Sequence, residues 1–90
     1  MRVKFFAYLR DYTGCSETEL PAVPTLRDLT RLLAERYGAK LRDIMLTAKG
    51  ELGPDIIIMI NGRHVVHLAG LDTALTDDDL VQIFPKVAGG

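Results

Sequence analysis

The segment Thr25-Leu26-Arg27-Asp28-Leu29-Thr30-Arg31-Leu32-Leu33-Ala34-Glu35-Arg36-Tyr37-Gly38 has the clearest helical pattern in the chain. Thr25 is a favourable N-cap, and Asp28 places a carboxylate in the first turn, where the helix dipole favours negative charge. Gly38 is positioned to end the helix. The apolar residues recur at the spacing of one helix face, and they are Leu26, Leu29, Leu32, Leu33 and Tyr37. We therefore predict one long amphipathic helix that buries a single face.

Two strand-like segments come before this helix. Apolar and polar residues alternate from Arg2 to Arg10, which is typical of a strand, and the inward face would carry Val3, Phe5, Ala7 and Leu9. Phe6 and Tyr8 fall on the opposite face. Residues 11–14 have the composition of a turn, and Glu17 to Leu20 predict a second, antiparallel strand.

The segments after the helix predict a short helix and further strands. Residues 41–45 have a weak helical pattern. The β-branched run from Ile56 to Ile60 predicts a strand that is buried on much of both faces. Asn61-Gly62 is a strong hairpin signal, so we expect the return strand at residues 63–66 and the last strand at residues 80–84.

This order of elements is typical of an α+β fold. The economical arrangement is a mixed sheet of about five strands with one long helix packed on one face. The first and last strands would meet at the centre of that sheet. A chain of 90 residues leaves no room for a second core. We therefore predict one domain at residues 1–85 and a C-terminal tail at residues 86–90.

The sheet face opposite the helix is expected to carry apolar side chains. Phe6, Tyr8, Phe84 and part of the 56–60 run should lie there. A protein rarely exposes an apolar patch of more than a few hundred Å² without a purpose. Two interpretations remain open: the patch is a docking surface close to the tail, or the segment 39–52 folds over it.

Composition and charge exclude several kinds of function. The net charge of −1 and the scattered basic residues argue against a nucleic-acid binder. Cys15 is the single cysteine, which excludes an internal disulfide and a cysteine-based zinc site. No apolar stretch approaches a membrane span, and the N-terminus lacks the pattern of an export signal. We therefore expect no membrane partner and a cytoplasmic location.

No metal or catalytic centre is predicted within the chain. His64 and His67 are close in sequence, but no cysteine or third histidine lies near them. Asp77-Asp78-Asp79 lacks the spaced ligands of a calcium loop, so a solvated turn is the better interpretation. No nucleophile is paired with a base. We do not expect the chain to catalyse a reaction alone.

The sequence ends in Gly89-Gly90, shortly after the last predicted strand. Two glycines allow the backbone to lie in a channel that is too narrow for a Cβ atom. The residues after Pro85 reach at most about 17 Å when extended. This pattern predicts a slim tail that presents the carboxylate of Gly90 to the active site of another protein. A frayed terminus is the alternative.

Five stretches along the chain carry a resemblance to a known family. They are Phe5-Phe6-Ala7-Tyr8-Leu9-Arg10, Thr25-Leu26-Arg27-Asp28-Leu29, Ile60-Asn61-Gly62, Gly70-Leu71-Asp72-Thr73, and the ending Ile83-Phe84-Pro85 before Val87-Ala88-Gly89-Gly90. With them the chain resembles the ubiquitin-like β-grasp sulfur carriers, and most closely the small subunit of molybdopterin synthase. Lys86 stands where that family commonly has a second proline.

The resemblance implies a β-grasp fold and a carrier role. An adenylating enzyme of the ubiquitin-activating type would use ATP to convert the Gly90 carboxylate to an acyl-adenylate, and sulfur would then give a thiocarboxylate. The larger molybdopterin synthase subunit would use this sulfur to make the molybdenum cofactor. Gly89 would keep the tail slim, and the chain itself would bind no cofactor. The partner-binding residues would be Phe6, Tyr8, Phe84, Pro85, Lys86, Val87 and Ala88.

Three other functions remain open, because a fold does not decide function. The same thiocarboxylate could supply sulfur to cysteine, thiamine or tRNA thiolation. A ubiquitin-like protein modifier would instead join Gly90 to lysine side chains. A plain β-grasp interaction module would have an inert tail, and the removal of Gly89 and Gly90 would then change nothing.

Overall fold

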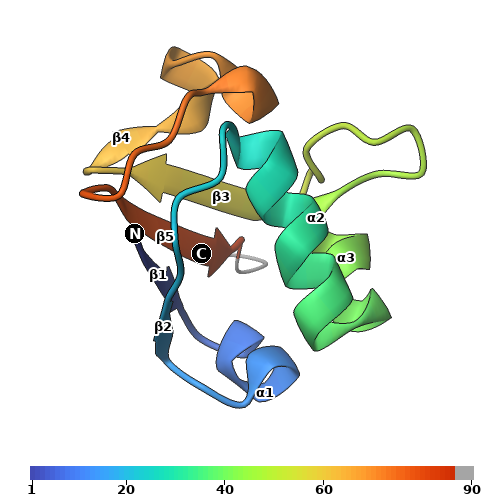
Figure 1. Cartoon of the computed structure of the whole chain (residues 1–90). Coiled ribbons are helices and arrows are strands. Elements are labelled where there is room, and N and C mark those ends of the chain that lie inside the picture. Colours follow the sequence, from blue (N-terminus) through green and yellow to red (C-terminus); the bar gives the residue numbers. More distant parts are fainter. Residues whose placement is uncertain (87–90) are drawn as a thin grey trace.

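The structure is a computed structural model of the chain and describes residues 1–86. Five strands form one sheet, and three α-helices pack beside it (Figure 1). The elements are β1 (Arg2–Phe5), α1 (Leu9–Thr13), β2 (Glu17–Glu19), α2 (Leu26–Tyr37), α3 (Ala39–Met45), β3 (Ile56–Ile60), β4 (Arg63–His64), the 3-10 helices η1 (Val65–His67) and η2 (Gly70–Asp72), and β5 (Leu80–Pro85).

The last strand occupies the centre of the sheet. The strand order is β2-β1-β5-β3-β4. β5 pairs in parallel with β1, placing Val81 opposite Val3, and antiparallel with β3, placing Phe84 opposite Ile57. The predicted meeting of the first and last strands is therefore confirmed. As a result, the chain that follows Pro85 continues from the central strand.

Helix α2 begins with a capping box, in which Thr25 and Asp28 bond to each other's backbone N–H groups. The Thr25 hydroxyl accepts a hydrogen bond from the Asp28 N–H, and the Asp28 carboxylate accepts one from the Thr25 N–H at 3.2 Å. This reciprocal pair satisfies two backbone donors that the helix itself cannot. Gly38 ends the helix with a φ of 97°, as predicted. The predicted short helix after it is also present, as α3.

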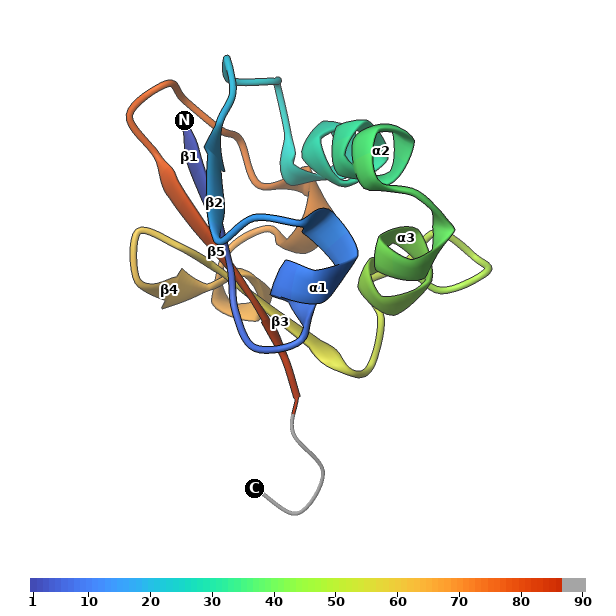
Figure 2. The same cartoon turned by 90° about the horizontal axis from the view of Figure 1, so that it is seen from below.

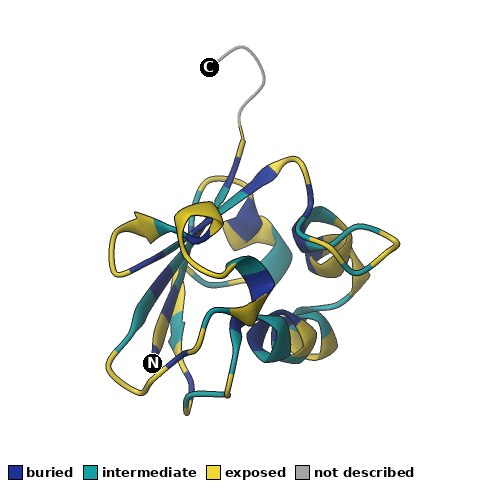
Figure 3. Cartoon of the chain, turned by 90° about the horizontal axis from the view of Figure 1, so that it is seen from above, coloured by how far each residue is buried: buried dark blue, intermediate teal, exposed yellow. Residues whose placement is uncertain are grey.

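The core lies between the sheet and the helices. Figure 2 shows α2 and α3 together on one side of the sheet. Alternate strand residues point to that side, and Figure 3 shows buried positions on the strands and on the helices that face them. The fully buried large side chains include Val3, Phe5, Ile58, Val81 and Ile83 from the strands, and Leu26, Leu29, Leu33, Leu41 and Met45 from the helices.

The first predicted strand is too long. β1 ends at Phe5, and the chain turns at Ala7, which is exposed and has a φ of 53°. The Leu9 N–H donates to the Phe6 carbonyl at 3.1 Å, and α1 begins there. Leu9 is buried as expected, but it reaches the core from a helix. The predicted turn at residues 11–14 is therefore the end of this helix.

The strands after α3 also differ in detail from the prediction. Ile56, Ile58 and Ile60 are buried, whereas Ile57 and Met59 are only half-buried, so β3 is not buried on much of both faces. Asn61-Gly62 makes the predicted hairpin turn, with φ values of 52° and 82°. The return strand is shorter than predicted because Val65 turns into η1 and buries its side chain there.

Within residues 1–86, every helix is too short or too polar to cross a bilayer.

Candidate functional site

The sheet has an outer face, which is the side turned away from α2 and α3 (Figure 2). The alternation along β3 and β5 places on it the half-buried residues Ile57, Met59, Leu80, Gln82 and Phe84. The segment 39–52 does not cover them. Leu41 and Met45 of this segment are fully buried in the core on the helix side. The interpretation in which this segment folds over the outer face is therefore wrong.

Two predicted partner-binding residues meet on the outer face. The rings of Phe6 and Phe84 stack with their centroids 4.2 Å apart and an interplanar angle of 15°. Phe6 is held beside β5 because its N–H donates to the Ile83 carbonyl at 3.2 Å. The stack lies at the end of β5 from which the chain leaves the sheet. Two partly exposed aromatic rings at this position can receive an apolar anchor from a partner.

Tyr8 does not join this stack. It precedes α1, its side chain is exposed, and its ring meets the ring of Tyr12 edge-on, with centroids 5.6 Å apart. Sequence alternation had placed it beside Phe6 because the strand was assumed to continue. The turn at Ala7 separates the two.

The chain leaves the sheet at Pro85 and Lys86. Pro85 is buried, and Lys86 is exposed. The Lys86 N–H donates to the Asp55 carbonyl at 2.8 Å, which extends the pairing of β5 with β3 past the last residue of the strand. The other predicted site residues, Val87, Ala88, Gly89 and Gly90, lie outside the described residues.

Charged residues border the apolar part of the outer face. On the β1 and β2 side, Arg2 and Glu17 form an ion pair at 3.2 Å, and both side chains are about half exposed. Lys4 lies between Glu17 and Gln82 in the register of the sheet. An exposed ion pair of this kind adds little stability. It gives the β1 and β2 side of the outer face a polar character.

A hydrogen-bond network that the sequence did not predict holds the β3–β4 hairpin to the start of β5. The Asn61 amide donates to the Asp79 carboxylate at 2.8 Å and accepts from the Leu80 N–H at 2.9 Å. Asp79 also accepts from the Thr76 N–H at 2.7 Å. Burial alone would raise the pKa of Asp79, but these hydrogen bonds outweigh it and lower that pKa. Asp79, in the turn before β5, therefore connects the β3–β4 hairpin to the start of β5.

Outside this network, the polar side chains of residues 1–86 make local contacts. Residues 1–86 contain no group of three or more histidine, cysteine, aspartate or glutamate side chains placed to hold a metal ion. His64 uses Nδ1 to accept the Val66 N–H at 3.1 Å. Cys15 lies with its sulfur 3.7 Å from the Tyr37 hydroxyl, and burial raises the pKa of that tyrosine.

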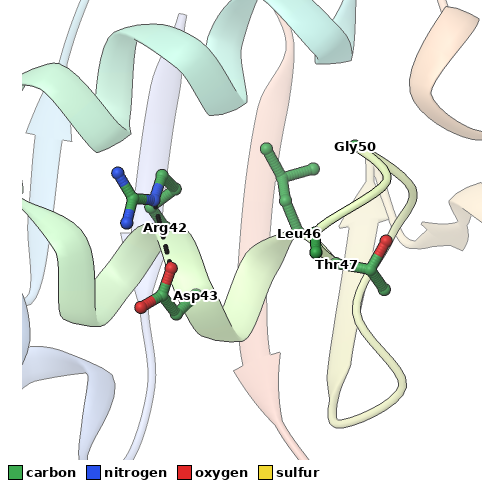
Figure 4. A pocket seen from close by; sticks show the side chains of 6 residues that line it. Arg42, Asp43, Leu46, Thr47 and Gly50 are labelled. Atoms are coloured by element: carbon green, nitrogen blue, oxygen red, sulfur yellow. Dashed lines mark hydrogen bonds and ion pairs between the residues drawn. The ribbon is translucent and has the colours of Figure 1, made fainter.

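An open pocket of about 590 Å³ lies next to α3 and the loop that follows it (Figure 4). Arg42, which donates a hydrogen bond to the neighbouring Asp43 at 3.1 Å, lines this pocket. Figure 4 also labels the lining residues Leu46, Thr47 and Gly50. The lining pairs no nucleophile with a base. It is built from elements on the helix side, so it does not belong to the outer face.

Comparison with known proteins gives the family. Residues 3–90 match the ThiS family. The chain belongs to the ThiS family. Small archaeal modifier protein 3 of Haloferax volcanii is 37% identical to this ThiS-family chain over 92 residues, which cover 100% of the chain and 98% of that relative. The molybdopterin synthase sulfur carrier subunit of Escherichia coli is 32% identical over 94 residues, with coverage of 100% and 99%.

Solved structures agree with this assignment. The solution structure of small archaeal modifier protein 1 from Methanosarcina acetivorans superimposes with a TM-score of 0.85 at 34% identity, covering 99% of this chain and 94% of the other. The fold is thus a ubiquitin-like β-grasp, as the resemblance implied. By name, these relatives are a modifier protein and a sulfur carrier subunit, and the solved structure is of a modifier protein.

Proposed function

We propose that this ThiS-family chain is a sulfur carrier that holds sulfur as a thiocarboxylate on Gly90. The proposal rests mainly on the family match, which extends to residue 90 and so includes Gly89-Gly90. The position of β5 supports it, because the chain leaves the central strand at Pro85 and Lys86, close to the Phe6–Phe84 stack. The tail would thereby be presented next to a surface on which a partner can dock.

The chemistry has two steps. An oxygen of the Gly90 carboxylate attacks the α-phosphorus of ATP, and the bond to pyrophosphate breaks. Hydrosulfide then attacks the carbonyl carbon of the acyl-adenylate, the C–O bond to AMP breaks, and the thioacid loses a proton to leave the thiocarboxylate, so no change of oxidation state is needed. Activation is needed because a carboxylate lacks a good leaving group. An adenylating enzyme supplies the catalytic groups, and the chain supplies the reacting carboxylate and the docking face.

We propose molybdopterin as the destination of the sulfur. The relative from Escherichia coli, which matches the chain over its full length, is named as the sulfur carrier subunit of molybdopterin synthase. By analogy, a larger synthase subunit would bind the outer face and receive the tail. The other sulfur pathways use the same thiocarboxylate and would differ only in this acceptor.

The second candidate is a protein modifier that joins Gly90 to lysine side chains. It is favoured by the names of two relatives, both archaeal modifier proteins, at 37% and 34% identity. A carrier and a modifier share the adenylation step. They differ in the nucleophile that displaces AMP, which is sulfur for a carrier and a lysine amine for a modifier.

The decisive measurement is the intact mass of the protein after incubation with ATP, sulfide and extract from its own cells. We expect a mass increase equal to the replacement of one oxygen by sulfur. The increase should be absent without ATP and absent in a chain that lacks Gly90. Circular dichroism of the truncated chain should match the wild type, because no described core residue lies after Pro85.

Each alternative gives a different result. Conjugates of higher mass, without the sulfur adduct, would favour the protein modifier. No change of either kind, in an extract that activates a known carrier, would contradict both candidates and favour an interaction module. A truncated chain that still gains sulfur would exclude Gly90 as the reacting residue.

A further inference from the structure

The outer face carries a row of side chains that crosses all five strands. The register of the sheet aligns Glu17 of β2, Lys4 of β1, Gln82 of β5, Met59 of β3 and His64 of β4. Residues directly opposite each other on neighbouring strands point to the same side of a sheet. Because Met59 lies on the outer face, the half-buried His64 lies there too, at the edge of the sheet.

The His64 ring already uses one of its two nitrogens within the fold. Nδ1 accepts the Val66 N–H at 3.1 Å and so caps η1. A ring nitrogen that accepts a hydrogen bond carries no proton, and the neutral ring therefore carries its proton on Nε2. The capping bond thus fixes the tautomer and makes Nε2 a hydrogen-bond donor.

Within residues 1–86, this Nε2 donor has no hydrogen-bond acceptor. Glu17, the acidic residue of the same row, is four strands away, which is about 19 Å at the usual strand spacing. Asp79 lies at the start of β5, but the Asn61 amide bonds one of its carboxylate oxygens and the Thr76 N–H bonds the other. The donor is therefore available to a partner.

The sheet edge around His64 is rich in donors and lacks acidic side chains. Between Asp55 and Asp72 the sequence holds Arg63, His64 and His67 and no aspartate or glutamate. Arg63 and His67 are exposed, and the rings of the two histidines meet edge-on, with centroids 6.1 Å apart. A surface of this kind is complementary to a carboxylate, which only accepts hydrogen bonds.

We propose that His64 is a specificity-determining residue of the outer face, and that its Nε2–H donates to a carboxylate of the adenylating enzyme when the two proteins dock. This inference rests on the proposed function. Met59 and Ile57 lie on β3 between His64 and the Phe6–Phe84 stack. Once a partner covers these apolar side chains, water is excluded and a hydrogen bond to a charged group gains strength.

The specificity comes from the cost of a missing acceptor. A partner that fits the apolar part of the outer face but offers no acceptor to His64 would leave the Nε2–H buried and unpaired, which weakens its binding. The Phe6–Phe84 stack would then hold any apolar anchor, and His64 would distinguish among the proteins that carry one.

Two substitutions separate the two nitrogens of the ring. His64→Asn places an amide oxygen near the position of Nδ1, so it keeps an acceptor for the Val66 N–H and removes the outer donor. His64→Gln places an amide N–H near the position of Nε2, so it keeps the donor and removes the inner acceptor. His67→Asn, at the neighbouring exposed histidine, is the control.

Isothermal titration with the adenylating enzyme purified from the same cells gives the dissociation constant Kd. For His64→Asn we expect Kd to rise between about tenfold and a hundredfold, the equivalent of one hydrogen bond to a charged group. His64→Gln and His67→Asn should stay within about threefold of the wild type, as is usual for substitutions that remove no contact.

Thermal unfolding of the isolated chain should give the opposite order. His64→Gln should unfold about 4–8 °C lower, since η1 loses one capping hydrogen bond, and His64→Asn should unfold within about 2 °C of the wild type. A merely structural role for His64 would weaken binding most in the least stable variant. Weaker binding by the more stable His64→Asn therefore reports on the contact with the enzyme.

A double-mutant cycle identifies the acceptor. Acidic residues on the surface of the enzyme are changed to alanine one at a time, and each variant is titrated with the wild-type chain and with His64→Asn. One enzyme variant should bind the wild-type chain about tenfold or more weakly and lose nothing further with His64→Asn. If His64→Asn binds weakly but no enzyme variant couples to it, the acceptor is not a carboxylate and the proposal is overturned.

The sulfur adduct on Gly90 keeps this test apart from the proposed function. If the wild-type chain gains sulfur and His64→Asn binds the enzyme as tightly as the wild type, the role of His64 alone fails. An equal loss of binding in His64→Asn and His64→Gln would also overturn it, because the donor would then not be the cause. If the wild-type chain neither binds the enzyme nor gains sulfur, the proposed function and the role of His64 both fail.

Discussion

Gly53 is buried where the chain returns from α3 toward β3. Its N–H donates to the Met45 carbonyl at 2.8 Å. A Cβ atom built on Gly53 would collide with the carbonyl oxygen of Ile44, which belongs to the backbone of α3 and cannot move without distorting the helix. The position therefore requires glycine for space, whereas each of the other glycines within residues 1–86 has a positive φ.

Gly53→Ala should destabilise the fold by about 1–3 kcal/mol, the usual cost of overpacking a filled site. The free energy of unfolding in urea, monitored by circular dichroism, measures this. Lys49→Ala, on an exposed residue of the same loop, is the control and should change stability by less than about 0.5 kcal/mol. A stable Gly53→Ala variant would mean that α3 and this loop adjust freely to each other.

Asp79 should make stability depend on pH. Its pKa is lowered in the folded chain by hydrogen bonds from Thr76 and Asn61, which outweigh the opposite effect of burial. The carboxylate therefore stabilises the fold above the ordinary aspartate value of about 3.9. That stabilisation is lost as the pH falls through the lowered folded value.

Asp79→Asn removes this titrating group, so the stability difference between wild type and variant should shrink as the pH falls from 7 to 3. Urea unfolding at several pH values measures it. Asp78→Asn is the matched control, since the Asp78 carboxylate is exposed and accepts no hydrogen bond within residues 1–86. A constant difference across the pH range would contradict the assigned role of Asp79.

Helix α2 depends on the reciprocal cap between Thr25 and Asp28. Thr25→Ala should cost about 0.5–2 kcal/mol of stability, because the Asp28 N–H loses its acceptor. Thr25→Ser keeps the hydroxyl and should retain most of the stability. Thermal unfolding of the three proteins side by side measures this, and equal losses in both variants would assign the effect to the threonine methyl group.

The elements around α2 show where local patterns mislead. Apolar alternation from Arg2 to Arg10 predicted one strand, but β1 ends at Phe5, and the Phe6 N–H makes the last hydrogen bond to β5 before the chain turns at Ala7. Leu9 is buried in either arrangement, because a helical turn after Ala7 also directs it to the core. The burial of Leu9 was therefore predicted correctly, but Leu9 lies in helix α1 and not in the predicted strand.

The whole sheet has one face covered by helices and one that carries the Phe6–Phe84 stack. Phe84→Lys should weaken binding to the adenylating enzyme by about 2 kcal/mol or more, as expected for an aromatic anchor at an interface. The loss of fold stability should be smaller, about 0.5–1.5 kcal/mol for the ring stack, because Phe84 is only half-buried.

Isothermal titration with that enzyme and thermal unfolding of the isolated chain measure these two effects. Gln82→Lys, on the same strand and face but outside the stack, is the control for added charge and should change binding less. A large fall in the unfolding temperature of Phe84→Lys, with binding by the remaining folded protein unchanged, would show that the stack serves the fold and not the partner.

Much of the candidate site could be predicted from the sequence, because it lies on regular elements. Phe6 and Phe84 were expected on one uncovered face, and the structure brings them together. The position of Tyr8 was predicted wrongly, because the residue with positive φ in the turn is Ala7, and an alanine gives no sequence signal for such a turn. The hydrogen bond between Asn61 and Asp79 was also not predicted, because a contact between residues far apart in the chain leaves no local sequence pattern.

The sequence by itself determined the helix of residues 26–37 and the hairpin at Asn61-Gly62. These follow from local periodicity and turn preference, which covalent geometry imposes on each short segment. Only the tertiary structure decided that segment 39–52 leaves the outer face uncovered and that Lys86 pairs with Asp55. Both depend on which distant segments come to lie side by side, and no short stretch of the chain encodes that alone.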